Sequence, residues 1–246
     1  MEPHFTKSVL TSKINVMAIK TYLTAKEIKE MVDQAPTLRD AVIIMFLGDV
    51  GCRVSELVSI KVENIDIERG VVLIPHLKVG IRKRCPQCDR TSGKKQNFCP
   101  RCGTDISKVA VEGTQERTRL VNVGEETLAL VKEYLSQRKT QSDLLIPLSR
   151  QQVYFVIRDA ARKAGLDGQV MLNPDTGRRH FVHPHSFRDS LAVDWLELKG
   201  DPEGQKALQE HLGHQRFETT ARYLKLHPRQ VKKVGDEVRE RRFGEG

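Results

Sequence analysis

Hydrophobic positions recur with helical spacing over most of the chain. Thr24 and Glu27 have the spacing of a capping box, and Ile28, Met31 and Val32 then form the i, i+3, i+4 stripe of one buried helix face. Further helices are expected over residues 37–48 and 53–60. Beyond residue 124 the chain is predicted to be mostly helical, with helices over residues 125–137, 150–165, 184–198, 205–212 and 216–226.

Strand signals are confined to the middle of the chain. Two β-branched runs, residues 64–68 and 71–77, flank the pair Arg69-Gly70 in a strand–turn–strand pattern, and a short strand is expected over residues 119–123. Residues 81–113 break the pattern, because they combine few apolar residues with four cysteines and many basic side chains. The sequence therefore predicts an α+β fold, mainly helical, with a small antiparallel sheet and an insertion at residues 82–110. Residues 1–20 form an N-terminal segment without firm periodicity.

Length and charge narrow the class of protein. The 246 residues allow one large domain or two modest ones, and 41 basic against 32 acidic side chains give a net charge of +9. This balance favours an anionic partner, most often nucleic acid. No run without a charged residue is longer than that of residues 41–48, eight residues, which is far too short to span a membrane, and no secretory signal is expected. We expect a soluble, cytoplasmic protein that binds DNA or RNA and no membrane.

The cysteines indicate a metal site. Cys85 and Cys88 form one C-x2-C pair, Cys99 and Cys102 form a second, and ten residues separate the pairs. Four thiolates are the closed tetrahedral set that structural Zn²⁺ prefers, with no position left for substrate, so the metal is predicted to be structural. Four unrelated buried cysteines and a pair of disulfides are the alternatives. Cys52 lies outside the module and is interpreted as a small core residue.

Basic residues crowd the same insertion. Between residues 82 and 108 there are eight basic and two acidic side chains, and a zinc ion held by four thiolates has a net charge of −2, which balances part of the excess. The surplus is available for DNA phosphates, and a solvated basic loop is the equal alternative. The candidate DNA contacts are Lys83, Lys94, Lys95 and Arg101.

Three further stretches carry polar residues, at residues 51–57, 183–189 and 211–223. In order they resemble the catalytic domain of the tyrosine recombinases, the phage integrase family, whose pattern is G-x-R-x-x-E, a lysine in a β-hairpin, H-x-x-R, L-G-H and a tyrosine. The resemblance covers about residues 21–227 apart from the insertion. The main domain is predicted to span residues 21–246, including the C-terminal segment. The matching residues are Arg53 with Glu56, Lys78, His185 with Arg188, His214 and Tyr223.

The residue types suit phosphoryl transfer from a DNA diester. Negative charge builds on the non-bridging oxygens, and the paired guanidiniums of Arg53 and Arg188 match that geometry. A tyrosine hydroxyl, with an ordinary pKa of about 10, is a poor nucleophile at pH 7 without help. The resemblance makes Tyr223 the nucleophile, with His185 as the natural proton acceptor and His214 as support for it or for the phosphate.

Three residues in or near the motifs have a less direct interpretation. The resemblance makes Lys78 the acid that protonates the 5′-oxygen leaving group, and Lys83 is the alternative if the insertion displaces Lys78. Residues 79–118 separate Lys78 from the next strand, where the family usually has a short turn. Glu56 is interpreted as a residue that orients a catalytic side chain, with a surface ion pair as the alternative.

The resemblance implies a site-specific recombinase that forms a 3′-phosphotyrosyl intermediate on double-stranded DNA without ATP or a catalytic metal. It also implies self-association on DNA, in a tetrameric synapse, and a core-binding domain or accessory protein that completes the DNA clamp. Val231, Val234 and Val238 form a narrow stripe on a predicted C-terminal helix that docks on a neighbouring protomer or on its own domain. The alternatives are a type IB topoisomerase-like nicking-closing enzyme and a non-catalytic zinc-ribbon DNA-binding protein.

Overall fold

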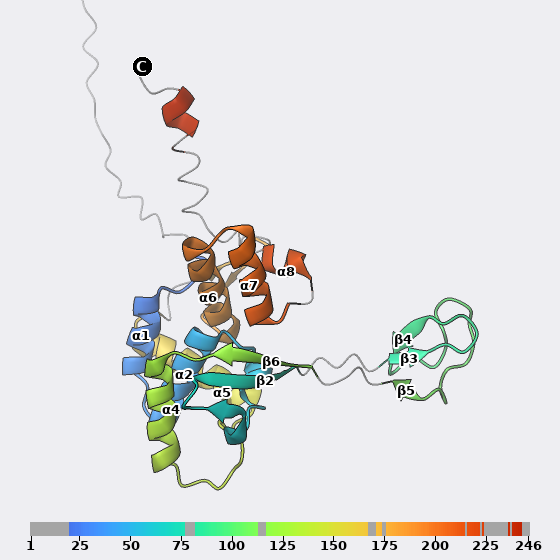
Figure 1. Ribbon diagram of the computed structural model, residues 1–246, viewed down its shortest axis with the longest axis horizontal. Helices are drawn as coiled ribbons and strands as arrows, with labels where there is room; N and C mark the ends of the chain where they lie inside the picture. The colour runs from blue at the N-terminus through green and yellow to red at the C-terminus, as the bar shows by residue number, and fades with distance from the viewer. Residues whose placement is uncertain are drawn as a thin grey trace, which may run out of the picture.

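The computed structural model in Figure 1 describes most of the chain beyond residue 19. The described residues are 20–76, 82–112, 117–166, 171–173, 176–214, 216–221, 223, 236 and 238–242. Three sequence-based predictions fall outside them: the N-terminal segment up to residue 19, the hairpin residue Lys78, and Val231 with Val234 of the C-terminal stripe.

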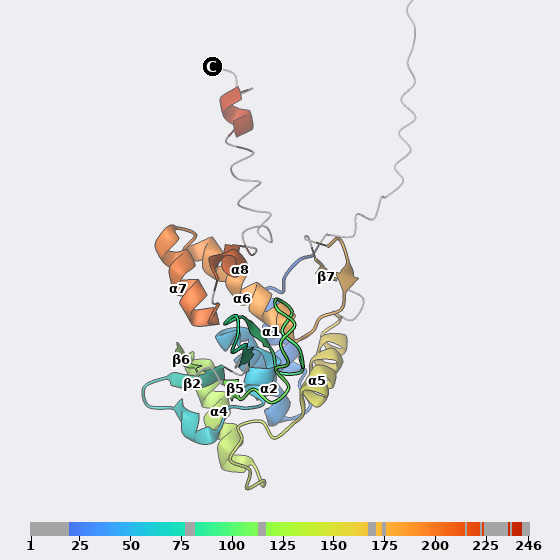
Figure 2. The same cartoon turned by 90° about the vertical axis from the view of Figure 1, so that its right-hand side faces the viewer.

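Helices make up most of the main body, and α2 lies at its centre. This helix is apolar on every side and contacts α1, α4, α5 and α6, while Figure 2 shows α6, α7 and α8 grouped together. Thr24 opens α1 with the predicted capping box, its hydroxyl accepting from the Glu27 backbone. The helices are α1 (Ala25–Asp33), α2 (Leu38–Val50), α3 (Val54–Leu57), the 3-10 helix η1 (Val62–Asn64), α4 (Glu125–Gln137), α5 (Arg150–Lys163), α6 (Pro184–Leu198), α7 (Pro202–Leu212) and α8 (Phe217–Ala221).

The main body contains a small antiparallel sheet of order β1-β2-β6. Its strands are β1 (Ile65–Asp66), β2 (Val71–His76) and β6 (Arg117–Asn122), and the β2–β6 ladder runs from Val71 opposite Asn122 to His76 opposite Arg117. Val72, Ile74 and Val121 are buried in the core that α2 also lines. The predicted fold class is therefore confirmed: a mainly helical α+β domain with a small antiparallel sheet.

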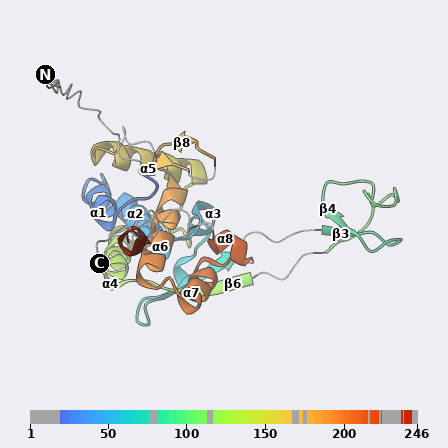
Figure 3. The same ribbon diagram turned by 90° about the horizontal axis from the view of Figure 1, so that it is seen from above.

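The insertion forms its own sheet, of order β4-β3-β5. The strands are β3 (Arg82–Arg84), β4 (Thr91–Gly93) and β5 (Val111–Glu112), and Cys85, Cys99 and Ile106 form a small separate cluster beside them. Figures 1 and 3 show this module as a lobe beyond the end of the β2–β6 hairpin. The chain thus leaves one hairpin strand, builds a second small sheet, and returns to the partner strand.

Several boundaries differ from those expected. The helix predicted over residues 53–60 is the single turn α3, and the one predicted from residue 205 begins at Pro202 because Asp201 accepts from the Gly204 backbone at 2.7 Å. The hairpin of β7 (Met171–Leu172) and β8 (Arg179–His180) was not predicted, since two-residue strands leave almost no alternation in a sequence. Within the described residues, no helix is long and apolar enough to cross a membrane.

Gly51 turns the chain from α2 toward α3. Its φ of 61° is left-handed, and a Cβ there would lie 2.6 Å from Leu191 Cδ2. Gly177 has a similar φ of 64°, but nothing lies within 4 Å of the corresponding Cβ position. The two glycines share the backbone constraint and differ in packing.

We therefore expect Gly51→Ala to lower the free energy of unfolding by about 3 kcal/mol, because backbone strain and overpacking add. Gly177→Ala should cost only about 1 kcal/mol, the backbone term alone. Urea unfolding of the two variants and the wild type measures both values. Equal losses would show that Leu191 moves aside without cost.

Candidate functional site

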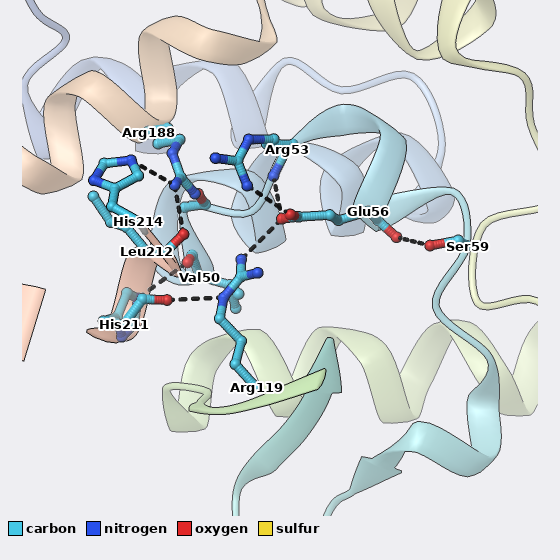
Figure 4. A network of polar contacts seen from close by, with 10 residues as sticks. Val50, Arg53, Glu56, Ser59, Arg119, Arg188, His211, Leu212 and His214 are labelled. Atoms are coloured by element: carbon cyan, nitrogen blue, oxygen red, sulfur yellow. Dashed lines mark hydrogen bonds and ion pairs between the residues drawn. The ribbon is translucent and has the colours of Figure 1, made fainter. Parts of the chain in front are cut away.

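Four motif residues that lie far apart in the sequence meet at one place. Arg53 follows the end of α2, Arg188 lies on α6, His214 follows α7 and Tyr223 follows α8. Figure 4 shows Arg53, Arg188 and His214 facing a common centre. The His214 and Tyr223 rings are stacked, with centroids 6.0 Å apart and an interplanar angle of 19°.

Arg188 is buried and is held by the ends of two helices. Its Nη1 donates to the Gly51 carbonyl at 2.7 Å and its Nη2 donates to the Leu212 carbonyl at 2.6 Å. These carbonyls lie at the C-terminal ends of α2 and α7, where the helix leaves its last carbonyls free and favours a cation. Burial, together with the charge of Arg53, lowers the pKa of Arg188 below its ordinary value.

The contacts of His214 fix its tautomer. Arg188 Nη2 lies 3.0 Å from His214 Nε2, and since a guanidinium only donates, Nε2 must accept. The proton of the neutral ring then lies on Nδ1, which is 2.9 Å from the Thr220 hydroxyl and donates to it. Gly213, at φ 67°, ends α7 and turns the chain so that His214 reaches Arg188.

Tyr223 is held by apolar packing. Only 1% of it is exposed, and it belongs to the small cluster that Ala192, Val193, Leu196, Leu208 and Leu212 form between α6 and α7. Tyr223 also acts electrostatically on Arg188, in the direction that raises the pKa of Arg188. The phenol is therefore close to the buried guanidinium as well as to the His214 ring.

Glu56 is buried between two arginines. Its Oε1 accepts from Arg53 Nη1 at 2.8 Å, while Oε2 accepts from the Arg53 backbone at 2.9 Å and from Arg119 Nη2 at 2.8 Å. Burial alone would raise the pKa of Glu56, but the hydrogen bonds and charges of Arg119 and Arg53 outweigh it and lower the pKa to about 2. With 2% of its side chain exposed, Glu56 is not the surface ion pair considered as an alternative.

Arg119 also belongs to this network, although the sequence pattern predicted it only as part of a strand. Besides binding Glu56, it donates from Nε to the His211 carbonyl at 2.9 Å. Val121 and Val123 are buried while Leu120 is exposed, so odd-numbered residues of this stretch face inward. A charged residue at an inward strand position signals such a contact, but six residues do not fix the inward face from sequence alone.

His185 lies differently from the buried residues. Its side chain is 44% exposed, and its Nε2 is 3.5 Å from Asp189 Oδ1, one turn further along α6. His183, which was not among the predicted site residues, is the more buried histidine, with Nδ1 2.6 Å from the Ser186 hydroxyl. Burial and the neighbouring His180 and His185 lower the pKa of His183 to about 4.

The four cysteines of the insertion converge. All four Sγ atoms lie within 4.8 Å of one another, with Cys85 and Cys102 3.5 Å apart and Cys88 and Cys99 also 3.5 Å apart. Four sulfurs around a tetrahedral zinc at ~2.3 Å would lie about 3.8 Å apart, so the arrangement fits that ion. The alternative of four unrelated cysteines is wrong, and none of the four is in a disulfide.

Lys83 was assigned incorrectly as a DNA contact and as a substitute acid. It is 6% exposed, and its Nζ donates to the carbonyls of Gln96 and Ser107, both at 3.2 Å, inside the module. The reason is the alternation of β3, whose outer two residues are exposed while Lys83 points inward. The other candidate contacts, Lys94, Lys95 and Arg101, are exposed.

Comparison with known proteins gives consistent matches. The family model described as "Phage integrase family" matches residues 21–90 and 102–230. Tyrosine recombinase XerA of Thermococcus kodakarensis is 27% identical over 219 residues, which cover 88% of this chain and 62% of XerA. Type 1 fimbriae regulatory protein FimE of Escherichia coli K12 is 28% identical over 211 residues, 84% of this chain and 86% of FimE.

Solved structures share the fold. The crystal structure of XerA recombinase has a TM-score of 0.61 at 21% identity, covering 90% of this chain and 66% of that one. XerH site-specific recombinase bound to palindromic difH substrate, a post-cleavage complex, has a TM-score of 0.57 at 17% identity, covering 88% and 53%. The chain spans about 60% of the length of the XerA relatives. Since the family model covers most of the sequence, the chain belongs to the phage integrase family.

Proposed function

We propose that this chain is a site-specific DNA recombinase that cuts and rejoins strands through a covalent bond to Tyr223. The observation that carries the proposal is the contact series from Arg188 through His214 to Tyr223, which joins a phosphate-binding group to a phenol in one buried site. The names of the relatives, tyrosine recombinase XerA and XerC, support the same activity. The substrate is double-stranded DNA.

The positive charge of the site suits a phosphodiester. Arg188 is held by neutral carbonyls, so its charge is not cancelled by a carboxylate, and its buried Nε has no hydrogen-bond partner among the described residues. Arg53 shares Glu56 with Arg119, which leaves the group of three guanidiniums and one carboxylate net positive. We propose that Arg53 and Arg188 bind the non-bridging oxygens, where negative charge grows in the transition state.

The bond changes balance without a metal or a nucleotide. The Tyr223 oxygen attacks phosphorus, the bond from phosphorus to the 5′-oxygen breaks, and the product is a 3′-phosphotyrosine with a free 5′-hydroxyl. The phenol proton passes to a base, for which we propose His185, and Lys78 protonates the 5′-oxygen. Rejoining reverses these steps with the 5′-hydroxyl of another strand. We further propose assembly of four protomers on DNA.

Replacing Tyr223 tests the nucleophile. Tyr223→Phe keeps the ring and its packing, so we expect DNA binding to survive while the covalent adduct with a nicked suicide duplex disappears. Tyr134→Phe, a buried tyrosine on α4, is the matched control and should still form the adduct. Adduct formation by Tyr223→Phe would contradict the assignment. Adduct without products joined from two duplexes would indicate a nicking-closing enzyme.

Glu56 is proposed to orient Arg53, and its ionisation should stabilise the fold. Its pKa in the folded chain, about 2, lies below the unfolded value of about 4.3. The stabilisation is therefore complete above the unfolded pKa and is lost as the pH falls toward 2. The loss in that window should be on the order of 3 kcal/mol. Unfolding measured from pH 6 to 2 should be less acid-sensitive in Glu56→Gln than in the wild type. Glu126→Gln, which alters an exposed pair with Lys29, should match the wild type.

We also propose that the four cysteines hold one structural zinc ion, which would order the module and thereby the hairpin end that carries Lys78. Cys85→Ser with Cys88→Ser should abolish zinc binding and reduce cleavage. The unfolding midpoint of the main body should stay unchanged, because the module packs around its own small cluster. Trp195 on α6, the only tryptophan, reports the unfolding of the main body. Adding zinc back after chelation should restore cleavage by the wild type but not by the double variant. Wild-type cleavage by the zinc-free double variant would show that the module has no role in the cleavage reaction.

The exposed basic residues of the module are proposed DNA contacts. Lys94→Glu with Lys95→Glu should flatten the salt dependence of DNA affinity by roughly one unit of slope for each phosphate that the variant no longer binds. An unchanged slope would mean that these side chains are only solvated.

A further inference from the structure

Arg119 contacts two other parts of the site from the β2–β6 hairpin, the Glu56 carboxylate and the end of α7. It lies on β6, opposite Ile74 of β2, in the hairpin that carries the module. From there its Nη2 reaches the Glu56 carboxylate at 2.8 Å and its Nε reaches the His211 carbonyl at 2.9 Å. With 11% of its side chain exposed, the guanidinium is largely enclosed by the protein.

One branch of these contacts leads to Arg53. Glu56 Oε2 accepts from Arg119 and from the Arg53 backbone, while Oε1 accepts from the Arg53 guanidinium. Both carboxylate oxygens are therefore occupied, and the rotamer of Glu56 is fixed from two sides. Removing Arg119 would release one side of the carboxylate and let Arg53 move with it.

The other branch leads to His214. The His211 carbonyl that accepts from Arg119 lies three residues before His214, at the end of α7. A Cβ at Gly213 would lie 3.1 Å from Arg119 Cδ and 3.2 Å from its Nη1, so the Arg119 side chain packs directly against the bare backbone of the turn. The turn that presents His214 to Arg188 thus rests on Arg119.

We propose that Arg119 is a positioning residue for the DNA-cleavage reaction, which sets Arg53 through Glu56 and sets His214 through the α7 turn. This inference rests on the proposed function. A guanidinium serves two acceptors in fixed directions, whereas a lysine ammonium is a single point that cannot hold both acceptors in this geometry. Arg119→Lys therefore keeps the charge beside Glu56 but breaks the bridge.

Arg138 provides a matched control, because it makes the same kind of contact away from the site. Its Nη1 donates to the Leu144 carbonyl at 2.9 Å and its Nη2 donates to the Ser142 carbonyl at 2.8 Å, in the loop after α4. Arg138→Lys thus removes a guanidinium that bridges two loop carbonyls away from the site. A comparison of the two variants separates positioning from general stability.

The test is single-turnover cleavage of a nicked suicide duplex, measured beside DNA affinity and the urea unfolding midpoint. We expect Arg119→Lys to cut the cleavage rate at least tenfold while the Kd for DNA stays within twofold. Arg138→Lys should cleave DNA within twofold of the wild-type rate, even if its urea unfolding midpoint falls as far as that of Arg119→Lys. Near-normal cleavage by Arg119→Lys, or equal rate losses in both variants, would overturn the proposal.

A second measurement does not depend on activity. The ring signals of His214 in nuclear magnetic resonance spectra should shift in Arg119→Lys and stay in place in Arg138→Lys. If the wild type forms no covalent adduct, the proposed function fails, yet these shifts still test the positioning. Unshifted His214 signals in Arg119→Lys would overturn the inference about Arg119 and leave the proposed function standing.

Discussion

The buried carboxylate of Glu56 is the constraint on which the geometry of the site depends. A lone charge in the interior is costly, so Glu56 tolerates burial only with its oxygens occupied, and Arg53 and Arg119 supply the donors. These donors come from two distant parts of the chain, the turn into α3 and the strand β6. Satisfying one carboxylate therefore fixes the hairpin against the helical body beside Arg53.

Arg188 is a buried cation, and its partners are backbone carbonyls instead of charged groups. A buried guanidinium also needs acceptors, but a carboxylate acceptor would neutralise its positive charge. The Gly51 and Leu212 carbonyls satisfy its nitrogens as dipoles at two helix ends and leave the positive charge in place. The same contact requires α2 and α7 to end beside each other, which explains why Gly51 and Gly213 take left-handed conformations there.

The sequence predicted the motif residues better than the contacts between them. The resemblance to the phage integrase family placed Arg53, Arg188, His214 and Tyr223 in one site. The C-x2-C pairs predicted the sulfur cluster, because that motif is local and its residue types are specific. Arg119 and the buried position of Lys83 were missed, since each depends on the inward or outward direction of a short strand. A one-residue change of register reverses that direction, and six-residue or three-residue strands carry too little alternation to set it.

The position of the insertion explains how forty residues can interrupt a hairpin without disturbing the site. Six residue pairs hold β2 to β6, and Arg119 lies in the third-last pair before the hairpin opens toward the module. The entropy cost of closing a loop grows only slowly with its length, and a module with its own sheet and sulfur cluster orders much of the inserted chain independently. The hairpin therefore keeps its register, and through that register the Arg119 guanidinium keeps its place between Glu56 and the α7 turn.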